Sequence, residues 1–132
     1  MDKMPNSVNE GIALETYKSL ISISVEVFKY LALLNGGAAA AVLAGFDRLV
    51  KNIPLGALQI AVISFVVGLL LCGLAMFCAY WTQISLFNEY MGRMRRIHGS
   101  ILLAAALCSA LSLIAFAVGA MVSALSAHAT ST

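Results

Sequence analysis

The residues with the most potential for chemistry lie along the last apolar stretch of the chain, where hydroxyls recur with a helical period. The positions that alternate at three and four are Ser109, Ser112, Phe116, Gly119, Ser123 and Ser126. On a helix, this spacing places all six on one narrow face. In a membrane, a stripe of hydroxyls broken by one aromatic ring can line a pore. Its serines would then contact water, and Phe116 would form an apolar constriction that gates by dewetting.

The same serines have a second interpretation, in which they serve packing. A serine in a membrane helix can donate its hydroxyl to the backbone carbonyl four residues earlier, and its small size allows a neighbouring helix to approach closely. For the stripe itself we favour packing over the pore-lining role.

One strongly polar residue, Asn35, lies near the middle of the first apolar stretch. Its amide could line a pore or contact a ligand, but we favour an interhelical hydrogen bond that fixes the register of two helices. The residues after it form small-xxx-small pairs, which let helices approach closely. The pairs are Gly36 with Ala40, Gly37 with Ala41, and Ala41 with Gly45. Because they lie on a different face from Asn35, we predict two contact faces, one within the chain and one for a second subunit.

Groups for enzymatic chemistry are missing from the sequence. It contains no carboxylate pair, no Ser/His/Asp set and no Gly-rich phosphate loop. The three cysteines, Cys72, Cys78 and Cys108, lie in apolar runs, where a thiol behaves as a small hydrophobe, and they indicate neither a disulfide framework nor a metal site. A net charge of +2 is too small to indicate nucleic-acid binding. We therefore expect no catalytic residue, cofactor, metal or nucleic-acid partner.

The elements that must position these residues are apolar enough to cross a membrane. Of the 132 residues, 61% are hydrophobic and 11% are charged, whereas about 25% are charged in an ordinary soluble domain. Three stretches approach or exceed the length of about 20 residues that a span needs. They cover residues 28–46, 55–81 and 101–127. We predict an all-α helical bundle with three transmembrane helices, which forms one domain over residues 1–132.

Two amphipathic segments adjoin these spans. Residues 8–27 begin at a capping-box spacing and continue the apolar period of the first span, so one helix is expected from about Val8 to Phe46. Residues 82–97 form a basic amphipathic helix, on which Arg93, Arg95 and Arg96 are expected to meet lipid headgroups. We favour a position in the membrane interface for this helix. The alternative is a cytoplasmic stalk in which it pairs with the N-terminal segment.

The lysines and arginines predict the orientation of the chain. An N-terminus in the cytoplasm leaves two of them outside, Arg48 and Lys51, and six inside, as the positive-inside rule requires. The six are Lys3, Lys18, Lys29, Arg93, Arg95 and Arg96. The C-terminus is then expected outside.

The stretch LALLNGGAAAAVLAGF, residues 31–46, is followed by a second span that ends in CAYWTQ, residues 78–83. This half of the chain resembles small multi-pass inner-membrane proteins of bacteria with the pattern LxxLNGGAAxAxLAxF. The resemblance implies a bacterial inner membrane, and it brings no assigned function, cofactor or functional residue with it.

The abundance of small residues predicts a homo-oligomer, because a lone three-helix unit would leave contact faces unused. The leading hypothesis for function is a non-enzymatic membrane module that forms or gates an oligomeric pore, as a toxin-like or phage-defence effector would. The alternative is an accessory or immunity-type subunit that binds another membrane protein and conducts nothing. Membrane lipids are the other expected partners.

Overall fold

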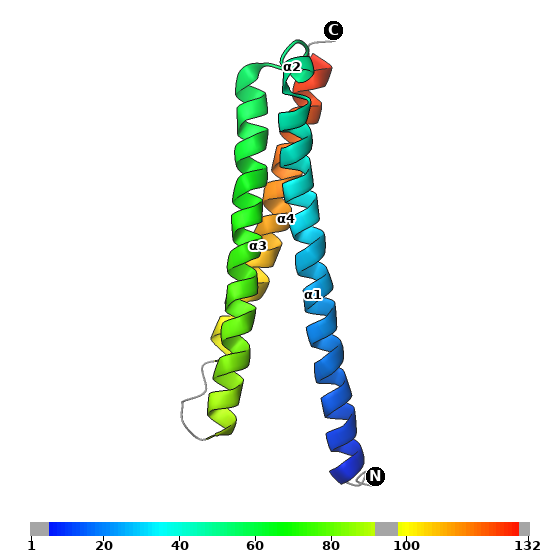
Figure 1. Cartoon of the computed structure of the whole chain (residues 1–132), viewed down its shortest axis with the longest axis vertical. Coiled ribbons are helices and arrows are strands. Elements are labelled where there is room, and N and C mark those ends of the chain that lie inside the picture. The colour runs from blue at the N-terminus through cyan, green and yellow to red at the C-terminus, as the bar shows by residue number, and fades with distance from the viewer. Residues whose placement is uncertain (1–5, 92–97, 130–132) are drawn as a thin grey trace.

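The structure, a computed structural model, describes residues 6–91 and 98–129 and shows an all-α bundle, as the sequence predicts (Figure 1). Its described helices are α1 (Asn6–Ala44), α2 (Phe46–Leu49), α3 (Leu55–Tyr90) and α4 (His98–Ala129). The N-terminus of the described chain lies at one end of the bundle, and the α1–α3 connection lies at the other end together with the C-terminus. The chain therefore runs through the bundle three times.

The first helix, α1, is continuous through the predicted amphipathic extension and the first predicted span. It ends at Ala44, and the short connection that follows contains the single turn α2. Ile53 is buried in this connection, and Pro54 precedes the first residue of α3 with a φ of −55°. Proline favours this position because its ring fixes φ near that value and because it lacks the N–H that a helix start leaves unpaired.

The helix α3 is longer than the second predicted span. Residues 82–90 continue α3, instead of starting a separate amphipathic helix over residues 82–97. Two physical reasons account for this. The sequence from Trp81 to Tyr90 contains no glycine or proline, and the buried side of α3 continues through Thr82 and Ser85. Arg93, Arg95 and Arg96 lie outside the described residues, so their contact with lipid headgroups stays a prediction.

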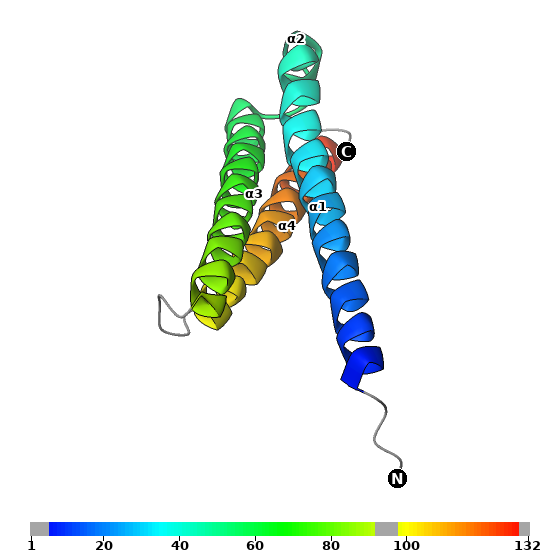
Figure 2. The same cartoon turned by 60° about the horizontal axis from the view of Figure 1, so that its bottom comes forward.

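The helices α3 and α4 pack side by side and antiparallel (Figures 1 and 2). The buried residues of α3 follow each other at three and four, as in a coiled coil, and several are small. They include Leu58, Ala61, Phe65, Gly68, Cys72 and Ala75, and on α4 they face a seam that includes Ala105, Ser112 and Gly119. Small side chains on both helices let the backbones approach closely over the length of the contact.

The helix α1 joins this pair through its C-terminal half. Leu31, Asn35 and Ala39 are buried, and Ala39 packs in a core cluster with Ala61 and Phe65. Toward its N-terminus, α1 diverges from the other two helices (Figure 2), but the Tyr17 hydroxyl still donates to Gln83 Oε1 of α3. A groove of ≈ 260 Å³ opens there between α1 and α3.

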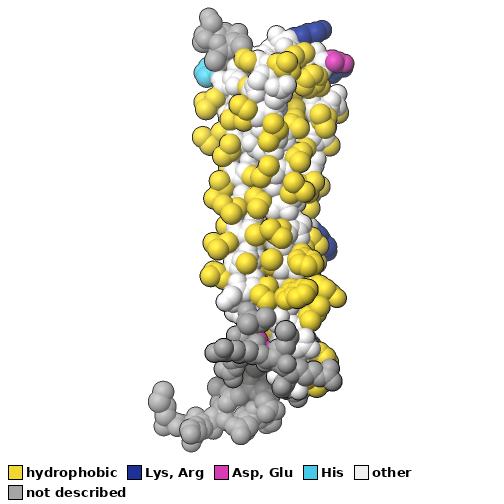
Figure 3. Space-filling view, turned by 90° about the vertical axis from the view of Figure 1, so that its left-hand side faces the viewer, with side chains coloured by type: hydrophobic (Ala, Val, Ile, Leu, Met, Phe, Trp, Pro, Cys, Tyr) yellow, Lys and Arg dark blue, Asp and Glu magenta, His cyan; other side chains and the backbone are white. Residues whose placement is uncertain are grey.

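Three described helices are long and apolar enough to cross a membrane, and on that ground the chain is a multi-pass membrane protein. The candidate spans are Leu14–Ala44, Leu55–Glu89 and His98–His128. Large hydrophobic side chains cover the outside of the bundle. Figure 3 shows them along one face, with charged side chains gathered mainly at its upper end. This surface suits contact with lipid tails in the middle and with polar headgroups at the end.

Candidate functional site

Three helices meet at one polar junction in the middle of the bundle, which consists of Asn35 on α1, Gly68 on α3 and Ser112 on α4. The Ser112 hydroxyl donates to the Gly68 carbonyl oxygen at 2.7 Å. The Asn35 Nδ2 group lies 3.2 Å from Ser112 Oγ and 3.4 Å from the Ser112 carbonyl oxygen, and it donates to both. It also lies 3.1 Å from the Leu31 carbonyl oxygen of its own helix, so its two hydrogens are shared among three acceptors. All three junction residues are buried, so these bonds form away from water and link α1, α3 and α4.

The remaining polar atom of the junction, Asn35 Oδ1, is buried and accepts no hydrogen bond from the described N–H and O–H groups. It lies against Gly68. A Cβ atom at Gly68 would stand 2.6 Å from Asn35 Cγ and closer still to Oδ1. The hydrogen that glycine carries in place of Cβ therefore points at Oδ1, which is the geometry of a weak Cα–H···O contact. Only glycine leaves room for the amide at this position.

The serine stripe of α4 is engaged inside the subunit. Ser109 donates to the Ala105 carbonyl oxygen and Ser123 to the Gly119 carbonyl oxygen, each at 2.9 Å and four residues back on α4. Ser112 reaches α3 instead, through the bond to Gly68. The hydroxyls of these three serines thus form bonds within one chain.

The aromatic member of the stripe, Phe116, also packs inward. Its ring lies 5.8 Å from the Phe65 ring, centroid to centroid, at an angle of 40°. Gly119, one turn further along α4, fits against the same Phe65 ring. Ser126, the last member, is half-buried near the end of α4. Phe116 therefore contributes to the contact between α3 and α4.

The glycine and alanine cluster after Asn35 lies mostly away from the bundle. Gly37, Ala40 and Ala41 are exposed, and a Cβ atom at Gly37 would meet nothing within 4 Å. A Cβ atom at Gly36 would lie 3.9 Å from Leu69 Cδ1 of α3, which is an ordinary van der Waals distance. The remaining member, Gly45, is half-buried at the end of α1. The contact with a second subunit, which the sequence assigns to this face, stays a prediction.

Gly68 is the junction residue that the sequence reasoning missed. Its signal is positional, because it lies in the centre of the second span and shares a helical face with the small residues Ala61, Cys72 and Ala75. A glycine in that setting indicates close approach by another group, but not which group approaches.

Among the described residues, the charged side chains lie outside the junction. Glu89, near the end of α3, accepts from the His98 backbone N–H at 3.3 Å, and its other oxygen lies 2.7 Å from His98 Nδ1. It thereby ties the end of α3 to the start of α4. Glu26 and Lys29 form an ion pair at 2.8 Å on the outside of α1. No group of three or more His, Cys, Asp or Glu suited to hold a metal ion is found among the described residues.

The chain was also compared with protein-family models, with curated proteins and with solved structures. None of the three comparisons gives a match. The geometry of the bundle is therefore the basis for the functional conclusion.

Proposed function

We propose that the protein is a non-enzymatic integral membrane module that acts through contacts with other membrane chains, as an accessory subunit does. The observation that carries this proposal is the use of the α4 hydroxyls. Ser109, Ser112 and Ser123 all donate to backbone carbonyls of the same chain, which is how polar side chains support helix packing. A stripe used in this way favours the accessory subunit over a pore lined by α4.

The outer face of α1 is the surface that supports contact with another chain. Gly37, Ala40, Ala41 and Ala44 are exposed there. Small residues on a membrane helix allow a partner helix to approach closely, whereas lipid tails gain little from them. We therefore place the contact with another membrane chain on this face.

A substitution in open space tests this contact without disturbing the subunit. Gly37→Leu adds a side chain where nothing lies within 4 Å, so the bundle should fold and melt like the parent. The mass of the complex extracted from native membranes in mild detergent should fall, because the leucine blocks close approach. The matched control is Gly73→Leu on α3, which also enters open space and should leave the mass unchanged. A parent of monomer mass, or equal masses for the parent and both variants, would contradict the proposal.

A second candidate function is a homo-oligomeric pore lined by α1. The observation that favours it is the Glu26–Lys29 pair, whose side chains are 67–69% exposed within the candidate span Leu14–Ala44. Charged side chains inside a span commonly mark an ion or substrate pathway. Conductance of liposomes that contain the purified protein separates the two candidates. A closed homo-oligomer that conducts favours the pore, and a silent protein in a hetero-complex favours the accessory subunit.

We place the protein in the inner membrane of a bacterium, with the N-terminus in the cytoplasm and the C-terminus outside. The positive-inside rule supports this orientation. Only two of the eight lysines and arginines, Arg48 and Lys51, lie in the α1–α3 connection, which is then outside. In a chain without native cysteines, Asn52→Cys should react with an impermeant thiol reagent in intact cells. Reaction only after permeabilisation would reverse the orientation.

A further inference from the structure

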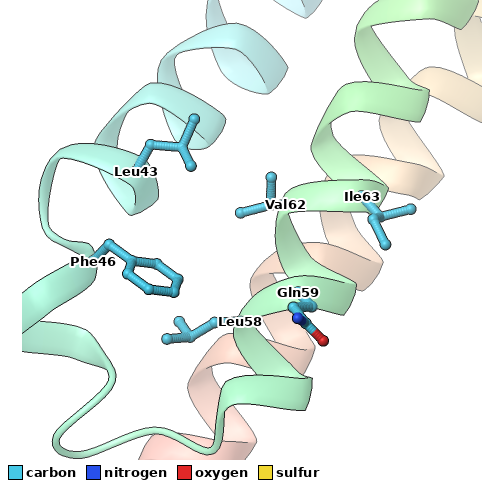
Figure 4. A pocket seen from close by; sticks show the side chains of 6 residues that line it. All are labelled: Leu43, Phe46, Leu58, Gln59, Val62 and Ile63. Atoms are coloured by element: carbon cyan, nitrogen blue, oxygen red, sulfur yellow. The ribbon is translucent and has the colours of Figure 1, made fainter.

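An apolar groove lies between α1 and α3 at the end of the bundle that carries their connection. It has a volume of ≈ 470 Å³, and its lining residues are Leu43, Phe46, Leu58, Gln59, Val62 and Ile63. Figure 4 shows the side chains of Leu43 and Phe46 across a gap from the α3 side chains. Leu43 and Ile63 are 60% and 62% exposed, so the groove opens to the surface that meets lipid.

The residues at this end follow the same order as the parts of a phospholipid. The connection carries exposed Arg48 and Lys51 beside one exposed carboxylate, Asp47, and has a net charge of +1. Gln59, an exposed amide on the groove wall, lies about 6 Å along the axis from the start of α3, and Ile63 lies about 12 Å along it. Basic groups thus lie at the connection, where a phosphate would be. The Gln59 amide, beside the apolar Leu58 and Phe46, lies at the level of a glycerol ester, and Ile63 lies at the level of an acyl chain.

The size of the groove favours a lipid over another helix. One turn of a helix 10 Å across takes up roughly 400 Å³, so a groove of ≈ 470 Å³ would accept about a single turn. Its α3 wall is correspondingly short, since the lining residues run only from Leu58 to Ile63. An acyl chain is flexible and can lie along so short a wall. The phosphate of the same lipid would lie at the positive charge of the connection.

From this layering, charge and size, we infer that the groove binds an acyl chain of an anionic glycerophospholipid whose phosphate lies at Arg48 and Lys51. The site is separate from the outer face of α1, and it does not depend on whether the protein is an accessory subunit or a pore.

Native mass spectrometry of the full chain in neutral detergent tests this site, with phosphatidylglycerol and phosphatidylcholine of identical acyl chains as the probes. The parent should retain phosphatidylglycerol in preference to phosphatidylcholine. Arg48→Gln with Lys51→Gln should weaken phosphatidylglycerol binding at least fivefold, because each basic residue near an anionic headgroup contributes about that factor. Lys29→Gln, which removes an exposed charge far along α1, should leave the preference unchanged.

Filling the groove tests the apolar part of the site. Val62→Trp and, at the mouth, Ile63→Trp should each reduce the binding of both lipids at least fivefold. Leu70→Trp, on an α3 position that is 69% exposed and outside the groove, should not. Thermal melting of each variant verifies that it is folded, and Ile63→Trp keeps the test valid if Val62→Trp does not fold. Equal binding of the two lipids by the parent, full binding by Ile63→Trp, or a change in oligomer mass without a change in lipid count would overturn the site.

Discussion

Replacement of Gly68 by alanine is expected to lower the free energy of unfolding by about 3 kcal/mol, the upper part of the range for overpacked cores. The added methyl group would stand 2.6 Å from Asn35 Cγ and 3.0 Å from Nδ2. The amide cannot move aside freely, because Nδ2 is bonded to Leu31 and Ser112. The substitution should therefore break the junction and loosen the contact of α1 with the other helices. Thermal or denaturant unfolding of the purified protein in bilayer discs measures the loss.

Two further variants show whether the loss arises from the amide. Gly73→Ala changes another glycine of α3 that has nothing within 4 Å of its Cβ position, so the free energy of unfolding should stay the same or rise slightly. Asn35→Ala removes the side chain that the methyl group meets. The double variant Asn35→Ala with Gly68→Ala should then be about as stable as Asn35→Ala alone, a strongly non-additive result. Additive losses would show that Asn35 and Gly68 are not in contact.

Gly119→Ala is expected to have the second largest effect, a loss of about 1 to 3 kcal/mol in the free energy of unfolding. Its Cβ would stand 2.7 Å from Cε1 of Phe65. The Phe65 ring is only 3% exposed and packs against Phe116, so it has little room to turn. The expected result is a weaker contact between α3 and α4, measured by the same unfolding experiment.

The control for this position is Gly99→Ala on the same helix, where the Cβ atom would meet nothing within 4 Å. It should unfold like the parent. A Gly119→Ala protein as stable as Gly99→Ala would mean that α3 and α4 are further apart near Phe65 than the structure places them.

The sequence predicts the helices of this bundle well because their signals are local. Apolar length and the absence of charge define the spans at 55–81 and 101–127, and the repeat at three and four extends the first span toward the N-terminus. The structure has long helices at all three places. The end of α3 differs from the expectation, since the change from apolar to polar residues after Trp81 indicates where a span leaves the membrane, and not where a helix stops.

The partners of the polar residues could not be predicted from the sequence. The serine period shows that Ser109, Ser112 and Ser123 share a face, but it contains no information on whether that face meets water, its own backbone or another helix. Ser112 differs from the other two only because Gly68 and Asn35 lie opposite it. Such contacts join residues far apart in the chain, and they depend on the register of three helices.

The rate at which cysteines along the serine stripe are modified tests most directly whether α4 packs inside the subunit or meets water. In a chain without native cysteines and reconstituted in liposomes, Ser109→Cys, Ser112→Cys and Ser123→Cys are exposed to an impermeant thiol reagent, with Lys51→Cys in the exposed connection as the reactive reference. Because these serines donate to backbone carbonyls within the bundle, the three stripe positions should react at least 100-fold more slowly than position 51, a difference of about 2.7 kcal/mol. Modification of the three positions at the rate of position 51 would show that the stripe lines a water-filled pathway, and it would contradict the packing role on which the proposed function rests.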